Sequence, residues 1–401
     1  MNKLPSDWQI KTINEVCNIY TGNSINKKKK EENFIGLKEG LNYIGTKDIS
    51  FNNIIEYENG VKIPFKDLKD FKIAKSNTSL LCIEGGSAGR KIGFTNQDVC
   101  FGNKLCCFEA IEDEPKFIYF YLQSNDFLRE FNSNIQGLIG GVNKENLRKI
   151  EIPIPPLDEQ KRIASALSKI DAYLENTIKL IEEKERFKRG IAKKLLTCKE
   201  GENIPEARFK GFEDEWEIVK LGDMFDNFKE KNNEDKIILD STIDKGVIPN
   251  SLTERKIIRK KESLSNYKLV KKGCFVISLM SFQSGFEYSD YEGIISPAYT
   301  VLKPKIEMAH YFYKYYFKSF KFIKDLRPYA EGIRHGKQIK FKACKDILVP
   351  YPSIEEQEKI GGYLSLLDKE IDNLKKQKEL IKEMKRGAMK KLLSGEVRLL
   401  E

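Results

Sequence analysis

The sequence has few of the residues that most often perform metal-dependent or nucleophilic chemistry. It contains two histidines, His310 and His335, and its eight cysteines include no Cys-x-x-Cys pair. Zinc sites are built from Cys and His ligands at short, regular spacings. We therefore predict no metal site. No nucleophile elbow or cluster of catalytic groups is present either, so we predict no catalytic residue.

Long apolar runs and targeting signals are also missing. No apolar run approaches the roughly 18 residues that a membrane span needs, and the start MNKLPSDWQI does not resemble a signal peptide. Cysteines without a disulfide pattern are typical of a reducing compartment. We therefore expect a cytoplasmic protein whose cysteines are reduced and mostly buried. The formal net charge of +10 permits a polyanionic partner but does not prove one.

What the sequence does contain is a long internal repeat. Residues 152–197 and 349–394 align at one offset, so that Gln160 and Gln357 are 197 residues apart. Each copy opens with a Pro-x-Pro segment, which favours extended backbone, and continues into a long stretch without proline. An earlier match places Trp8 opposite Trp216 at an offset of 208. The repeating unit is thus a globular segment followed by a long helix.

Each predicted helix carries apolar residues at alternating steps of four and three, which is typical of a coiled-coil seam. Pairing the two similar seams with each other would bury both. Two surface helices on separate domains are the alternative. The seam residues are Ile163, Leu167, Ile170, Leu174 and Ile181 in the first copy, and Ile360, Leu364, Leu367, Ile371, Leu374 and Ile381 in the second.

The globular segments favour strands over helices, with short apolar runs between Gly, Asn and Asp residues. One helix is predicted in each, over residues 117–131 and 310–322. We predict an α+β chain with two β-rich globular domains separated by two long helices that form an antiparallel coiled coil. The predicted segments are a first domain at 1–151, a helix at 152–198, a linker at 199–211, a second domain at 212–348 and a helix at 349–401.

Two kinds of glycine-rich turn stand out in the globular segments. Residues 84–91 (EGGSAGRK) lie between two predicted strands and lack the spacing of a P-loop. They are either a plain hairpin or a turn that presents side chains to a ligand. A second turn closes each segment, at 137–141 and 332–336, and keeps its outer glycines while the residues between them change. It is either a connection or a scaffold for variable side chains.

Together these motifs resemble the specificity subunit of type I restriction-modification systems. The matching features are the Pro-x-Pro-x-x-x-Glu-Gln segments ending at Gln160 and Gln357, the helices ending in Lys-Lys-Leu-Leu, and the Trp-led starts. The resemblance implies two target-recognition domains that each read one half of a split DNA sequence. It implies binding to double-stranded DNA, to two modification subunits and to restriction (motor-nuclease) subunits. S-adenosylmethionine is expected on the modification subunit, with no cofactor in this chain.

Candidate DNA-binding residues follow from the chemistry of phosphate and base contacts. We predict that lysines of a basic loop contact phosphates and that polar residues on turns contact bases. The candidates are Lys27, Lys28, Lys29, Lys30, Ser87, Arg90, Lys91 and Lys104 in the first domain, and Gln283, Ser284, Arg334, His335, Lys337 and Gln338 in the second. Lysines and arginines near the helix ends, among them Lys188 and Lys385, are expected to be solvated, with contact to DNA or a partner as the alternative. The competing function is a non-catalytic coiled-coil scaffold that binds proteins alone.

Overall fold

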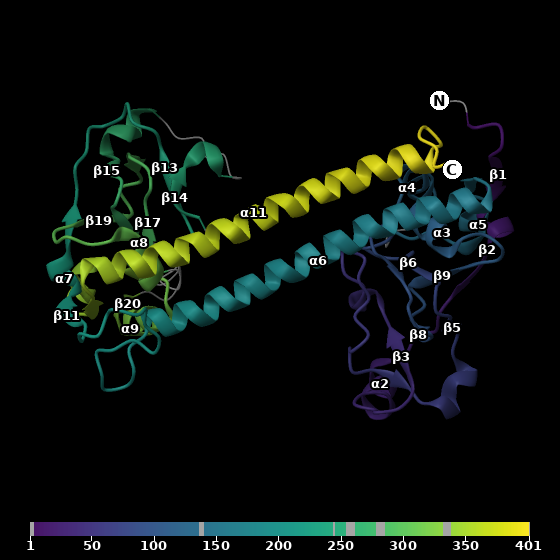
Figure 1. The fold of residues 1–401 in the computed structure, drawn as a ribbon, viewed down its shortest axis with the longest axis horizontal. Coiled ribbons are helices and arrows are strands. Elements are labelled where there is room, and N and C mark those ends of the chain that lie inside the picture. The colour runs from purple at the N-terminus through teal and green to yellow at the C-terminus, as the bar shows by residue number, and fades with distance from the viewer. Residues whose placement is uncertain are drawn as a thin grey trace. The chain divides into compact units, whose positions relative to one another are not determined.

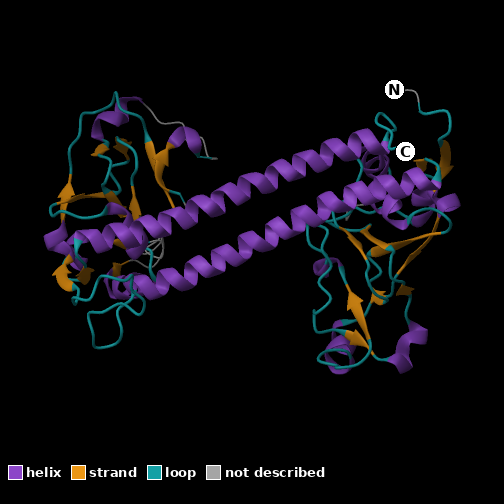
Figure 2. Cartoon of the chain, viewed as in Figure 1, coloured by secondary structure: helices purple, strands orange, loops and turns teal. Residues whose placement is uncertain are grey.

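The computed structural model describes residues 4–135, 140–243, 245–253, 261–277, 285–331 and 338–400. The candidates Gln283, Ser284, Arg334, His335 and Lys337 lie outside these ranges. The chain divides into two compact units, residues 1–178 with 377–401 and residues 179–376. Each unit therefore contains one globular domain, part of α6 (Leu157–Leu196) and part of α11 (Ile354–Leu393) (Figures 1 and 2).

The globular part of the first unit is a mixed structure around two four-stranded sheets. One sheet has the order β2-β9-β6-β7 and the other β4-β3-β8-β5. The strands are β1 (Gln9–Thr12), β2 (Cys17–Thr21), β3 (Leu41–Ile44), β4 (Lys62–Ile63), β5 (Ile73–Ala74), β6 (Ser79–Cys82), β7 (Ile92–Phe94), β8 (Val99–Phe101), β9 (Leu105–Ala110) and β10 (Glu151–Ile154). The helices are α1 (Ile13–Val16), α2 (Lys27–Asn33), α3 (Pro115–Tyr121), α4 (Asn125–Ser133) and α5 (Lys144–Arg148).

The second unit repeats one of these sheets and keeps the other as two short strand pairs, which a single parallel bridge from Ile238 to Ile294 links. The sheet β12-β19-β16-β17 corresponds to β2-β9-β6-β7, whereas β13 pairs with β14 and β15 with β18. The strands are β11 (Glu217–Lys220), β12 (Phe225–Phe228), β13 (Leu239–Thr242), β14 (Gly246–Pro249), β15 (Lys268–Val270), β16 (Phe275–Ile277), β17 (Phe286–Tyr288), β18 (Gly293–Ile295), β19 (Thr300–Pro304), β20 (Ala330–Glu331), β21 (Gln338–Ile339) and β22 (Leu348–Tyr351). The helices are α7 (Leu221–Met224), α8 (His310–Tyr316), α9 (Phe320–Leu326) and α10 (Phe341–Cys344).

The single aromatic helix predicted in each domain is wrong, because each is two helices. A serine breaks the first at Ser124, whose hydroxyl accepts a hydrogen bond from the backbone N–H of Phe127. Ser319 makes the same bond to the N–H of Phe322 between α8 and α9. A serine that caps a following helix has extended backbone, so the preceding helix must end before it.

The two long helices pair antiparallel within both units, which confirms the predicted fold class. In the first unit Asp171 pairs with Lys385 and Tyr173 with Gln377. In the second, Lys184 pairs with Glu370 and Lys188 with Asp368. Residues farther along α6 thus pair with residues earlier in α11, as antiparallel helices require.

Most of the predicted seam residues are buried, some of them against the globular domains as well as the opposite helix. Ile163 and Leu167 are fully buried in a cluster that contains Phe117 of α3 and Leu392 of α11. Of the other seam positions, Ile181, Ile360, Leu364, Leu367, Ile371 and Ile381 are buried, while Ile170, Leu174 and Leu374 are partly exposed. No helix in the described part of the chain has an apolar stretch long enough to cross a bilayer.

Candidate nucleic-acid interface

The start of each long helix is fixed to its globular domain by a buried glutamate. In the first unit the Glu159 carboxylate accepts a hydrogen bond from the Trp8 indole at 3.1 Å and from the Arg398 guanidinium at 2.8 Å. We call Trp8, Glu159, Gln160 and Arg398 the first helix-start cluster. Burial acts to raise the pKa of Glu159, but the bonds from Arg398 and Trp8 outweigh it and hold the pKa below its usual value. The carboxylate is therefore ionised and paired.

A second helix-start cluster in the other unit repeats this arrangement. Glu356 accepts hydrogen bonds from the Trp216 indole at 2.9 Å and from the Arg208 guanidinium at 2.8 Å. Its arginine comes from the segment that follows α6, whereas Arg398 follows α11. The Trp-led starts and the Glu-Gln pairs of the sequence repeat therefore belong to one structural device, which sequence reasoning did not identify.

The glutamines of the two clusters hold the first aromatic helix of each domain. The Gln160 side-chain oxygen accepts from the Glu114 N–H at 2.9 Å, next to α3, and its amide donates to the Pro155 carbonyl. Gln357 makes the matching bonds to the Ala309 N–H, next to α8, and to the Pro352 carbonyl. Each globular domain is thus fixed to the long helix that follows it in the chain.

Farther along, an ion pair at equivalent positions joins the two long helices in each unit. Lys385 contacts Asp171 at 2.7 Å and lies 5.5 Å from the ring centre of Phe120. The equivalent Lys188 contacts Asp368 and lies 5.0 Å from the Tyr315 ring. Lys188 and Lys385, which we expected to be solvated, are therefore partly buried in ion pairs.

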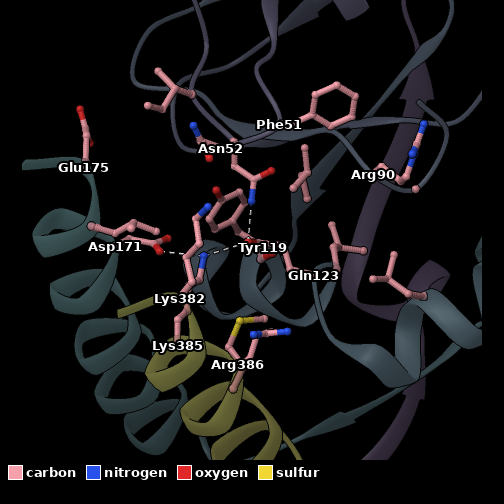
Figure 3. Close-up of a pocket in the computed structure, with 18 of the residues that line it drawn as sticks. Phe51, Asn52, Arg90, Tyr119, Gln123, Asp171, Glu175, Lys382, Lys385 and Arg386 are labelled. Carbon is pink, nitrogen blue, oxygen red and sulfur yellow. Dashed lines mark hydrogen bonds and ion pairs between the residues drawn. The ribbon is translucent and has the colours of Figure 1, made fainter. Parts of the chain in front are cut away.

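A pocket of about 700 Å³ opens in the first unit beside Lys385 (Figure 3). Its walls come from the loop at 51–54, the turn at 89–92, α3 and α4, and the two long helices. Four of its side chains are cationic and three are acidic, and Asn52, Asn53, Gln123 and Asn132 add amide groups. The cations are Arg90, Lys382, Lys385 and Arg386, and the acids are Asp171, Glu175 and Glu379. Such a mixture of amides and cations suits polar contacts with nucleic acid.

The glycine-rich turn at 84–91 brings the predicted residue Arg90 into the wall of this pocket and Lys91 close to Phe51, which also lines it. It connects β6 to β7, which pair antiparallel, and Gly85 and Gly89 have φ of +82° and +70°. Arg90 is exposed and lies 5.5 Å from the ring centre of Phe51, and the Lys91 ammonium lies 4.9 Å from it. Ser87 is half-buried, and its carbonyl accepts from the Arg90 N–H within the turn.

The other predicted residues of the first domain are placed differently. Lys104 forms an ion pair with Glu84 at 3.3 Å.

The basic loop predicted at Lys27, Lys28, Lys29 and Lys30 is wrong, because these residues form the first turn of α2. The Asn26 side chain caps this helix by accepting from the Lys29 N–H. Lys27 and Lys28 also pair with glutamates four residues on, which stabilises helix. The side chains of Lys27 and Lys28 remain exposed, and their contact with phosphates stays a prediction.

Of the second domain's candidates, the described residues include Gln338, which lies in β21 opposite Glu331.

No cluster of potential metal ligands occurs among the described residues. All eight cysteines are free and seven are buried, as the sequence predicted. Burial raises the pKa of Cys107 to about 11, so this thiol stays protonated and is a poor nucleophile.

A sequence model of the type I restriction modification DNA specificity domain matches residues 5–183 and again residues 213–383. The chain belongs to this family. As a specificity subunit it recognises a DNA target for a type I restriction-modification system and is not itself an enzyme, as the sequence predicted. The two matches coincide with the two repeats, and each includes one globular domain and most of its long helix.

Relatives of known name agree with this assignment. The chain is 26% identical to the type I restriction enzyme MjaVIII specificity subunit of Methanocaldococcus jannaschii, over 99% of this chain and 94% of the relative. The putative MjaX specificity subunit of the same organism is 28% identical, but the match covers 64% of this chain and 62% of that protein. A crystal structure of the S subunit from M. genitalium has the same fold, with a TM-score of 0.59 at 18% identity over 98% of this chain and 97% of that one.

Proposed function

We propose that this specificity subunit reads a bipartite DNA target, with each globular domain acting as the target-recognition domain for one half. The repeated helix-start cluster carries this proposal. Glu159 and Glu356 are held by the same types of partner in the two units, so the frame is duplicated. The parts distant from it differ, since a continuous four-stranded sheet in one domain corresponds to two strand pairs joined by a single bridge in the other. Two similar helix-start clusters that support different globular surfaces fit a target with two different half-sites.

The proposal extends to two modification subunits, each docked on one unit. Phe187 on α6 and Met384 on α11 are equivalent residues, 197 positions apart, and their exposed fractions are 51% and 50%. Leu180 lies seven residues before Phe187, and Leu380 lies four before Met384, and both are also exposed. Large apolar side chains at helical spacing on an outer face favour contact with a partner helix. One such face in each unit matches two copies of a partner.

The modification subunits would supply S-adenosylmethionine and the adenine methylation, and motor-nuclease subunits would join them for cleavage. Methylome sequencing tests the bipartite target in a host that carries this chain and its modification subunits. We expect methylated adenines in a split motif whose two halves differ. Methylation of a continuous motif, or the absence of a motif that depends on this chain, would contradict the proposal and favour a scaffold that binds proteins alone.

A further inference from the structure

An exposed aromatic side chain lies at the rim of the pocket in the first domain. Phe51 sits at the tip of the turn between Ile49 and Ile55, which bridge each other, and its exposed fraction is 62%. Leaving a phenylalanine in water forfeits about 1.5–3 kcal/mol of burial free energy. Phe65 in the same domain is equally exposed, at 63%, so exposure alone does not mark a binding residue.

The turn that carries Phe51 is held by several hydrogen bonds. The Ser50 hydroxyl accepts from the N–H groups of Asn52 and Ile54, and the Asn53 N–H donates to the Ser50 carbonyl. Asn53 has φ of +64°, a conformation that asparagine adopts more readily than most residues. Its side chain donates to Gln123 at 2.8 Å, and Gln123 also accepts from Lys385 of α11 (Figure 3). The ring is thus presented by a preorganised turn, which loses little entropy on binding.

The surroundings of Phe51 are also positively charged. The Arg90 guanidinium and the Lys91 ammonium both lie within cation–π distance of its ring. The Lys91 ammonium is held there by a hydrogen bond to the Thr46 carbonyl at 3.0 Å. Phe65 has no cation–π partner among the described residues. An apolar ring beside two cations suits a surface where an apolar group lies close to phosphates.

The major groove of B-DNA offers such a surface. Its base edges present hydrogen-bond donors and acceptors, and the apolar group among them is the 5-methyl of thymine. Resting on the proposed role of the first domain in reading one half-site, we infer that Phe51 contacts a thymine methyl there, with Arg90 and Lys91 directed at the neighbouring phosphates. Phe51 is then a specificity-determining residue for one A·T pair.

The test is a uracil scan of the target duplex with the complex of this chain and its modification subunits. Each thymine of the half-site read by the first domain, on either strand, is replaced in turn by uracil, which lacks only the methyl group. We expect one replacement to weaken binding about fourfold, as loss of one buried methyl implies. The Phe51→Ala complex should bind the thymine and uracil duplexes equally at that position. Phe51→Leu, which keeps an apolar contact, should restore part of the discrimination.

Phe65→Ala is the matched control, because it removes an equally exposed ring without neighbouring cations, and it should keep the wild-type discrimination. Phe51→Ala that still discriminates thymine from uracil would overturn the inference, as would a first half-site without thymine on either strand. In both cases the wild-type complex keeps a bipartite target, so the proposed function survives. A wild-type complex without such a target would overturn the proposed function and this inference together.

Discussion

A buried ion pair connects distant parts of the chain at the level of single residues. Arg398 bonds to Glu159 and also to Asp7 at 2.6 Å, so it joins the C-terminal segment to both the start of α6 and the N-terminal segment. Removing one partner of a buried, hydrogen-bonded pair leaves the other group poorly solvated. The helix-start cluster should therefore contribute to the stability of the whole first unit.

We predict that Glu159→Gln lowers the free energy of unfolding by about 1–3 kcal/mol at neutral pH. The folded-state pKa of Glu159 lies below its ordinary value of about 4.5, so the ionised group stabilises the folded state above that pH. The stabilisation is lost as the pH falls through the lower folded-state pKa. Urea unfolding of both proteins between pH 7 and about pH 3 should show the difference shrinking at acid pH.

Glu112→Gln is the control, since Glu112 is an exposed carboxylate of the same domain, and it should change stability by less than about 0.5 kcal/mol. A Glu159→Gln difference that stays constant with pH would contradict the assigned role of the carboxylate.

Sequence reasoning reached the clusters as a pattern but not as contacts. The repetition of Glu-Gln at Gln160 and Gln357 was visible, and so were the two tryptophans. The bond from Trp8 to Glu159 spans 151 residues, and local propensity contains no information on it. The four lysines of α2 were predicted wrongly for a different reason, because here the local signals were present and were overlooked. A polar, basic run resembles a loop, but the cap at Asn26 and the glutamates four residues on favour a helix.

At the level of elements, the long helices were the most predictable feature, because a heptad pattern is a strong and local signal. The breaks at Ser124 and Ser319 were missed, since aromatic residues run through both and conceal the cap. The outward faces of the helices were missed as well. Phe187 and Met384 fall outside the seam, and their equivalence emerges from the repeat offset combined with their exposure.

We predict that Phe187→Asp and Met384→Asp each weaken docking of one modification subunit. A charge at the centre of an apolar contact typically costs more than about 2 kcal/mol, or roughly 30-fold in affinity. Mass photometry of mixtures with the modification subunit should show one bound copy for each single variant and none for the double variant. Phe65→Asp, at a similarly exposed position in the globular domain, should bind two copies. Two copies bound to the double variant would exclude this docking face.

At the level of the whole molecule, the proposed bipartite target leads us to expect that the paired helices set the gap between the half-sites. We predict that inserting one heptad in both helices, near Ile178 and near Lys375, lengthens the spacer and leaves both half-sites unchanged. Seven helical residues add about 10.5 Å, which corresponds to roughly 3 bp of B-DNA. Both insertions are needed because the helices pair antiparallel in each unit.

Methylome sequencing of a host carrying the elongated variant measures the spacer and the half-sites at once. An unchanged gap with altered half-sites would contradict the prediction. Insertion of the same heptad in the exposed turn at 200–202, outside both helices and away from Arg208, is the control and should leave the target unchanged.

The first unit combines segments that lie far apart in the sequence, and this affects how it folds during translation. Met389, Leu392 and Leu393 lie in the same apolar cluster as Ile163 and Leu167, and Arg398 pairs with Glu159. These residues are translated more than 200 positions after Ile163 and Leu167. The part of the first helix that these residues cover therefore stays exposed until α11 has been translated. Chaperones that shield such surfaces are expected to bind there until synthesis is complete.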